Sequence, residues 1–247
     1  MGQSTFAFLL STLAGLSTLL GTIFIIFQPK NKESILITSL SFAAGVMLTV
    51  SISDLLPSSI ASLSQTFYII PSMIICMIGF VIGVITSMTI DDKLPDQQNH
   101  LKRVGIISMF VIILHNIPEG IATFLTSNTN TSLGITLTIA IALHNIPEGI
   151  SISVPIYYAT KSRFQAFIYT LISGLSEPFG AILAALFLSH WISPTMMGLL
   201  YAFIAGIMTH IALYELLPTS WNYHQFKKTI WAFLIGILIM IISHHFL

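Results

Sequence analysis

The segment Leu114–Ile121, LHNIPEGI, recurs unchanged as Leu143–Ile150, and each copy lies inside an apolar stretch long enough to cross a bilayer. A charged side chain at the centre of a membrane span costs about 2.5 to 3.5 kcal/mol on insertion scales. Polar residues that occur twice at the same depth therefore indicate one shared polar site within the membrane.

The composition is that of a polytopic membrane protein. Only 7% of the 247 residues are charged, 55% are hydrophobic, and the mean hydropathy is +0.90, which leaves few residues to cover a water-facing surface. The 9 basic and 9 acidic residues cancel, so the charge balance argues against nucleic-acid binding. Cys76 is the single cysteine of the sequence, and it has no partner for an internal disulfide.

A bilayer span needs about 20 mostly apolar residues, and eight stretches of the sequence meet this requirement. They are residues 4–27, 35–57, 67–90, 104–125, 132–157, 164–188, 194–217 and 229–246. No basic residue precedes the first stretch, as one would in a secretory signal, so we expect it to be retained. The sequence thus predicts an all-α integral membrane protein in which residues 1–247 form a single transmembrane domain.

The basic residues fall in alternate loops. They are Lys30, Lys32, Lys93, Lys102, Arg103, Lys161, Arg163, Lys227 and Lys228. Because basic loops stay in the cytoplasm, this pattern predicts that these four loops are cytoplasmic and that both termini are extracytoplasmic. We therefore expect a multi-pass protein of the plasma or inner membrane.

Two further repeats relate the ends of the chain. Residues 44–59 (AGVMLTVSISDLLPSS) align without gaps with residues 205–220 (AGIMTHIALYELLPTS), and residues 15–21 (GLSTLLG) match residues 174–180 (GLSEPFG) more weakly. Chance similarity between glycine-rich apolar helices explains the weaker match equally well. Together the repeats predict that spans 1 to 3 recur as spans 6 to 8 in the opposite orientation, with spans 4 and 5 between them. Many secondary transporters with alternating access are built in this way.

Each octapeptide places an imidazole, an amide and a carboxylate on one helix face, because the residues are three and four positions apart. These residues are His115, Asn116, Glu119, His144, Asn145 and Glu148. Pro118 and Pro147 cannot donate a helical hydrogen bond, so we expect kinked backbone beside the site, which neighbouring helices would tolerate in any case.

Glu119, Glu148 and Glu177 lie near the middle of spans that contain no internal lysine or arginine. Such carboxylates must be protonated, solvated or paired with a cation. Proton relay alone leaves the histidines and asparagines unexplained. Imidazole and oxygen ligands without a thiolate suit Zn²⁺, Fe²⁺, Mn²⁺ or Co²⁺ better than Cu⁺, Ca²⁺ or Mg²⁺. The sequence therefore predicts a site for divalent transition-metal cations.

Two adjacent ions fit this number of ligands if Glu119 and Glu148 each bridge them. The first ion would take His115, His144 and the two glutamates. The second would take Asn116, Asn145, the same two glutamates and Glu177.

Asp54 and Glu215 occupy equivalent positions of the longer repeat and lie toward opposite membrane faces. We expect Asp54 to attract ions from outside and Glu215, with His210, to receive them at the cytoplasmic side. The alternative is an ordinary interfacial carboxylate before a Leu-Leu-Pro helix end. Met47 is a candidate thioether ligand, with core packing as the alternative.

The doubled HNIPEG of spans 4 and 5, followed by SGLSEPFG at residues 173–180 in span 6, resembles the ZIP (Zrt-, Irt-like) family of divalent-metal transporters, most closely its bacterial ZupT type. The resemblance covers essentially the whole chain. It implies a 3+2+3 bundle of eight helices, a binuclear site between spans 4, 5 and 6, and assembly as a homodimer in the bilayer. It also implies uptake of zinc, and of iron, manganese, cobalt and cadmium, into the cytoplasm without a catalytic cofactor.

By motif position, Glu119, His144 and Glu148 resemble the first metal site of the family, with His115 close by. The second site corresponds to Asn116, Glu119, Asn145, Glu148 and Glu177. Many members carry a histidine-rich loop between spans 3 and 4, where this chain has only His100, so a metal-sensing role of that loop is not expected here.

Two other functions use the same residues. An intramembrane di-metal enzyme is one, but HNIPE lacks the glutamate that directly follows the first histidine of HExxH and serves there as general base. A metal-selective channel is the other, and it would differ from a carrier only in its mechanism.

Overall fold

The computed structural model describes residues 2–26, 32–93, 100–188 and 193–246. The described residues form helices joined by short turns, and eight of the helical segments are long and apolar enough to cross a membrane. The all-α, eight-span prediction is thereby confirmed.

Several spans are interrupted helices. The first four spans are α1 (Gln3–Ser17) with a 3₁₀ turn (Thr18–Thr22) and α2 (Ile23–Ile26), α3 (Lys32–Val50) with a π-helical segment (Ser51–Leu55) and α4 (Leu56–Leu63), α5 (Ile69–Lys93), and α6 (His100–Thr129). The last four are α7 (Thr131–Thr160), α8 (Arg163–Gly174) with α9 (Ser176–Leu183) and a π-helical segment (Ala184–Leu188), α10 (Pro194–His210) with a π-helical segment (Ile211–Leu216) and α11 (Leu217–Trp221), and α12 (Phe226–Phe246).

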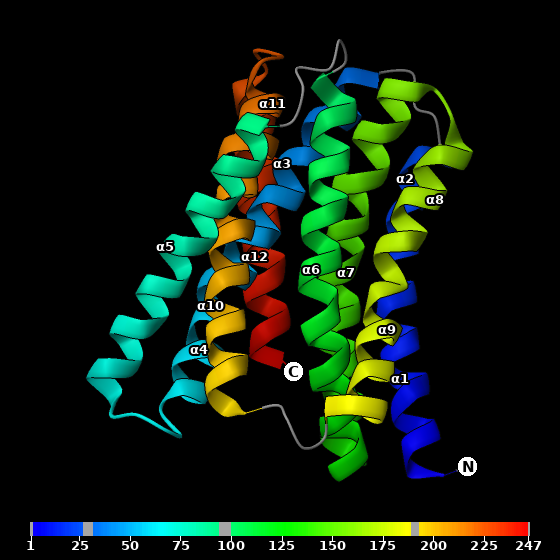
Figure 1. Cartoon of the computed structure of the whole chain (residues 1–247). Helices are drawn as coiled ribbons and strands as arrows, with labels where there is room; N and C mark the ends of the chain where they lie inside the picture. Colours follow the sequence, from blue (N-terminus) through cyan, green and yellow to red (C-terminus); the bar gives the residue numbers. More distant parts are fainter. Residues whose placement is uncertain (1, 27–31, 94–99, 189–192, 247) are drawn as a thin grey trace.

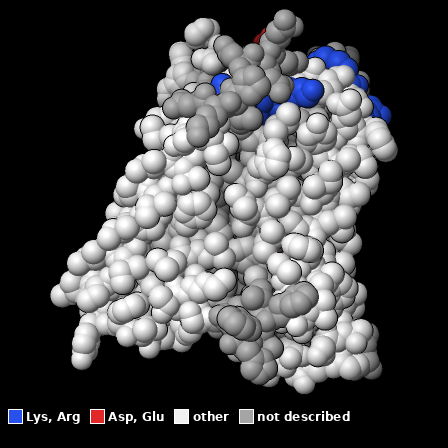
Figure 2. All heavy atoms as spheres, in the orientation of Figure 1, with Lys and Arg blue, Asp and Glu red and all other residues white. Residues whose placement is uncertain are grey.

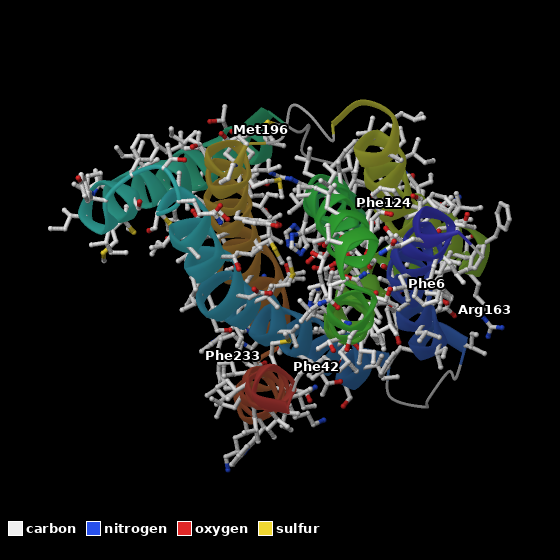
Figure 3. The ribbon with its side chains drawn as sticks, turned by 90° about the horizontal axis from the view of Figure 1, so that it is seen from below. Phe6, Phe42, Phe124, Arg163, Met196 and Phe233 are labelled. Carbon is white, nitrogen blue, oxygen red and sulfur yellow. The ribbon has the colours of Figure 1, made fainter. Side chains whose placement is uncertain are left out.

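The helices form two groups (Figure 1; Figure 3). In one group α6 packs against α7, α1 and α9; in the other α3 packs against α12, and α10 against α5 and α4. The contact of α3 with α7 joins the two groups. We call them the α6–α7 group and the α3–α10 group.

The Leu-Leu-Pro segments do not end their helices. Spans 2 and 7 continue to Leu63 and Trp221, beyond the predicted ends at residues 57 and 217. The π-helical turn before each proline explains the continuation, since the N–H of Leu56 donates to the carbonyl of Ser51, five residues back, and Leu217 donates to Ala212 in the same way. The wider turn carries the helix through a residue that has no N–H.

Four Phe-x-x-Gly segments, which the repeat comparison did not single out, build the α3–α10 group. They are Phe42–Gly45, Phe80–Gly83, Phe203–Gly206 and Phe233–Gly236. The segment that ends at Gly45 pairs with the one that ends at Gly236, and the segment that ends at Gly206 pairs with the one that ends at Gly83. In each pair, a Cβ on either glycine would collide with the carbonyl oxygen of the phenylalanine in the partner segment. Figure 3 labels one such contact, between α3 and α12. The α3–α12 and α5–α10 pairs are therefore built alike, as the inverted repeat requires.

The weaker repeat also has a structural counterpart. Gly15 in α1 and Gly174 at the end of α8 lie against each other, because a Cβ on either would collide with the carbonyl oxygen of the other. Equivalent positions of the two matched segments therefore meet, as they do near a pseudo-two-fold axis.

The described basic residues lie at one end of the bundle. Lys161 and Arg163 lie where α7 meets α8, and Lys227 lies in the first turn of the last span. Figure 2 shows the lysines and arginines of the visible face at that end. Helix α1 begins at the opposite end (Figure 1). Lys30 lies outside the described residues. We call the two ends the basic end and the α1 end.

Candidate metal centre

The candidate metal centre lies where the antiparallel helices α6 and α7 pack together. Nε2 of His144 lies 3.0 Å from Oε1 of Glu119, and Nε2 of His115 lies 3.1 Å from the same oxygen. Glu148 approaches from α7, its Oε1 being 3.4 Å from His115 Nε2. All four side chains are buried. The two octapeptides therefore face each other, with Glu119 between the histidines.

Close helix packing holds these residues in place. Gly120, directly after Glu119, lies against the backbone of Glu177 in α9, and Gly149, directly after Glu148, lies against the carbonyl of Thr18. A Cβ at either glycine would collide with that backbone. The glycine of each octapeptide thus allows a neighbouring span to reach the carboxylate that precedes it.

The two prolines lie inside continuous helices. Pro118 is in the interior of α6 and Pro147 in the interior of α7, and both helices continue on either side. The expected kink therefore does not divide either span into separate helices.

The asparagines hold the centre to the neighbouring helices. Nδ2 of Asn145 donates to the Ala14 carbonyl and to Oε2 of Glu177, both at 3.0 Å. Nδ2 of Asn116 donates to the Ser173 carbonyl at 3.3 Å, which is a backbone oxygen rather than a carboxylate. The Oδ1 atom of each asparagine is buried without a hydrogen-bond partner among the described residues.

Many buried oxygen and nitrogen atoms of the centre lack a hydrogen-bond partner in the part of the chain that the structure describes. They include Oε2 of Glu119, both carboxylate oxygens of Glu148, Oε1 of Glu177 and Nδ1 of each histidine. Buried polar atoms normally have partners, and several unsatisfied carboxylate oxygens in one place favour a cation. Single donor atoms of His115, Glu119 and His144 all lie within 4.8 Å of one another, close enough to hold one metal ion.

Asp54 lies between this centre and the α1 end of the bundle. It lines a cavity of 360 Å³ together with His144, and Thr126 and Leu133 from the adjoining ends of α6 and α7 complete part of the wall. The same cavity therefore touches the carboxylate of the π-helical segment in span 2 and one histidine of the centre.

Glu215 and His210 lie on the opposite side. Glu215 is buried in the π-helical segment of span 7, and Asp91 near the end of α5 pairs with Arg103. The His210 ring stacks on Tyr214, with centroids 4.9 Å apart.

The side chains of His210, His100 and Met47 contact other parts of the protein. Nδ1 of His210 lies 2.9 Å from the Ser87 hydroxyl, and Nε2 of His100 lies 3.0 Å from the Thr219 hydroxyl. Met47 is fully buried in the main hydrophobic core, where its thioether packs against other side chains.

Thr18 is a residue that the sequence reasoning missed. The alignment of residues 15–21 with 174–180 places it opposite Glu177, and the contacts agree, because Gly149 packs on Thr18 as Gly120 packs on Glu177. Its buried Oγ1 has no hydrogen-bond partner among the described residues. The weak repeat already contained this signal. The pseudo-two-fold arrangement thus has a carboxylate on one side and a hydroxyl on the other.

Comparison with known proteins gives consistent matches. A family model described as ZIP Zinc transporter matches residues 86–244. The zinc transporter ZupT of Clostridium perfringens is 36% identical over 274 residues, covering 98% of this chain and 96% of the relative. The ZupT proteins of Chlorobium phaeovibrioides (39% identical, 96% of each chain) and Streptococcus mutans (36% identical, 98% of each chain) match over a similar extent.

Proposed function

The chain belongs to the ZIP zinc transporter family and is a transporter of divalent metal ions rather than an enzyme; from this premise we propose that it takes up zinc through the α6–α7 centre. The observation that carries the proposal is the position of Glu119 between His115 and His144. Two imidazoles and a shared carboxylate, all buried, form a ligand set typical of zinc. Ferrous iron, manganese, cobalt and cadmium are further candidate cargoes of the same ligands.

We propose that the centre holds two ions. The first is bound by His115, His144, Glu119 and Glu148. Glu119 already lies within 3.1 Å of both histidines, and Glu148 lies 3.4 Å from His115. Glu177, held by Asn145, lies on the α9 side and provides the outer ligand of the second ion. The unpaired Oδ1 atoms of Asn116 and Asn145 supply neutral oxygen ligands to that ion.

The path of the ion follows from the two carboxylates of the longer repeat. Ions collect at Asp54 in the cavity that reaches His144, and they leave past Glu215 and His210 at the basic end. By the positive-inside rule the basic end faces the cytoplasm, so the direction is uptake and both termini are extracytoplasmic. The dimer that the family resemblance implies belongs to the same proposal.

Alternating access explains why the residues are divided between two groups of helices. The ligands of the centre lie on α6, α7 and α9, whereas Asp54 and Glu215 lie on spans 2 and 7 of the α3–α10 group. A shift of one group against the other would expose the ligands first to Asp54 and then to Glu215. A channel would share these ligands but would not require the shift.

Zinc flux into proteoliposomes tests the function. Substituting Glu148→Ala removes a carboxylate of the centre, and we expect uptake to fall to the level of empty liposomes while the protein still inserts. Glu33→Ala, which changes an exposed carboxylate at the start of α3, serves as the control and should transport normally. Uptake that saturates with zinc and falls steeply on cooling supports a carrier, whereas non-saturating flux supports a channel. Unchanged uptake by the Glu148→Ala variant would refute the assignment of the site.

A further inference from the structure

A second cavity lies at the basic end, and its described lining contains none of the predicted metal-binding residues. This groove of 630 Å³ is bounded by α2, α3, α7 and α12. Its walls are largely apolar, and they include Phe24, Phe42, Ile150 and Ile235. Ile150 is the last residue of the second octapeptide, two positions after Glu148, so the groove extends to the part of α7 that carries the metal centre.

The charged residues of the groove lie at its basic end. Lys227 and Lys228 are the charged residues among its described lining, and both are exposed in the first turn of α12. Nζ of Lys228 donates to the Ser34 hydroxyl of α3 at 3.3 Å, which places the ammonium group between the two helices that frame the groove. The described lining contains no carboxylate to neutralise the two lysines.

The groove has the dimensions and the polarity of a lipid site. Lys228 and Ile235 are seven residues apart, which is about 10 Å along the axis of α12, so the apolar walls continue well below the charged mouth. Trp231 lies between them and is 66% exposed, in the position that tryptophan favours at the boundary of headgroups and hydrocarbon.

We propose that this groove binds an anionic glycerophospholipid, with its phosphate at Lys227 and Lys228 and an acyl chain along the apolar walls. A basic pocket between membrane helices is a recognised form of anionic-lipid site. A zwitterionic lipid is attracted less, because the positive group of its own headgroup offsets the phosphate. Since α7 belongs to one helix group and α3 and α12 to the other, the bound lipid contacts both groups.

Each basic residue near a membrane surface strengthens the binding of anionic lipid by an amount that corresponds to about a fivefold change in affinity. Removing both lysines is therefore expected to weaken binding by about twenty-five-fold. Binding of phosphatidylcholine, which carries no net charge, should change little.

Native mass spectrometry of the full chain in detergent, titrated with phosphatidylglycerol or phosphatidylcholine, tests the proposal. The wild type should retain phosphatidylglycerol in preference, and the Lys227→Ala/Lys228→Ala variant should lose that preference. The matched control is Lys161→Ala/Arg163→Ala, which removes two basic residues from the same end; Figure 3 shows Arg163 pointing away from the bundle. This control should bind both lipids as the wild type does.

Further arms separate the alternatives. The Lys227→Arg/Lys228→Arg variant keeps both positive charges and should keep the preference for phosphatidylglycerol. If this variant lost the preference, a site based on charge would be contradicted. Glycerol 3-phosphate has no acyl chain and should not displace the lipid; displacement would show a phosphate site instead. Equal retention of the two lipids by the wild type, or a dimer in which the groove is covered by a second chain and takes up no lipid, would overturn the proposal.

Discussion

Asn145 donates a hydrogen bond of 3.0 Å from its Nδ2 atom to Oε2 of Glu177, joining the second octapeptide to α9. The equivalent residue on the other side of the pseudo-two-fold arrangement is Thr18, which has no carboxylate to offer. In the proposed two-ion site, the first ion would thus lie among residues that the repeat supplies in pairs. The second ion would depend on Glu177, which the repeat supplies once.

This asymmetry predicts that Glu177 controls the second ion alone. Glu177→Gln preserves the size of the side chain and removes its charge, so we expect zinc bound per chain to fall from two to one. Isothermal titration calorimetry of the purified protein measures the change. Thr18→Ser keeps the hydroxyl and should still bind two ions. If Glu177→Gln also binds two with unaltered affinity, the role given to Glu177 is wrong.

Histidine ligation predicts a pH dependence. A histidine must be neutral to bind a metal, and free imidazole is protonated near pH 6.5, so protons compete with zinc as the pH falls. We expect zinc affinity, measured without a proton gradient, to be high above pH 7 and to decline below about pH 6. Replacing both His115 and His144 with asparagine should weaken binding at every pH and flatten the decline. A flat profile for the wild type would argue against histidine ligands.

The Phe-x-x-Gly contacts predict a stability effect far from the centre. In Gly45→Ala the new Cβ would collide with the Phe233 carbonyl, and overpacking of this kind typically costs about 1 to 3 kcal/mol. The thermal unfolding midpoint in detergent should therefore fall. Gly2→Ala is the control, because its Cβ would come no closer than 3.7 Å to the nearest described atom, Oγ1 of Thr5. An unchanged midpoint for Gly45→Ala would contradict the close packing of α3 on α12.

Asp54 is predicted to act before the ions reach the centre. Since it lines the cavity that reaches His144, Asp54→Asn should raise the zinc concentration needed for half-maximal uptake and should leave the number of bound ions at two. Concentration-dependent flux together with calorimetry separates the two effects. Loss of one bound ion in Asp54→Asn would instead make this residue a ligand of the centre.

The sequence contained most of the fold because membrane spans follow from apolar length and loop charge, both of which are local. It also indicated the residues of the centre, since histidine and glutamate are energetically costly in the hydrocarbon of a membrane and mark functional sites there. Residue types do not predict that the helices continue past Pro57 and Pro218, because a π-helical turn depends on backbone geometry that they do not specify. The weak repeat aligns Thr18 with Glu177, but the place of Thr18 beside the centre depends on its packing against Gly149, a contact between distant segments.

Anomalous diffraction at the zinc absorption edge, from crystals of the protein grown with zinc, tests the central claim most directly. The account predicts peaks between α6 and α7, with one zinc bonded to His115, Glu119 and His144 at about 2.0 to 2.2 Å. Glu119→Gln crystals should lose that peak or show it strongly reduced. Zinc found only at the basic end near Asp91, or only on the surface, with no peak between the octapeptides, would contradict the account.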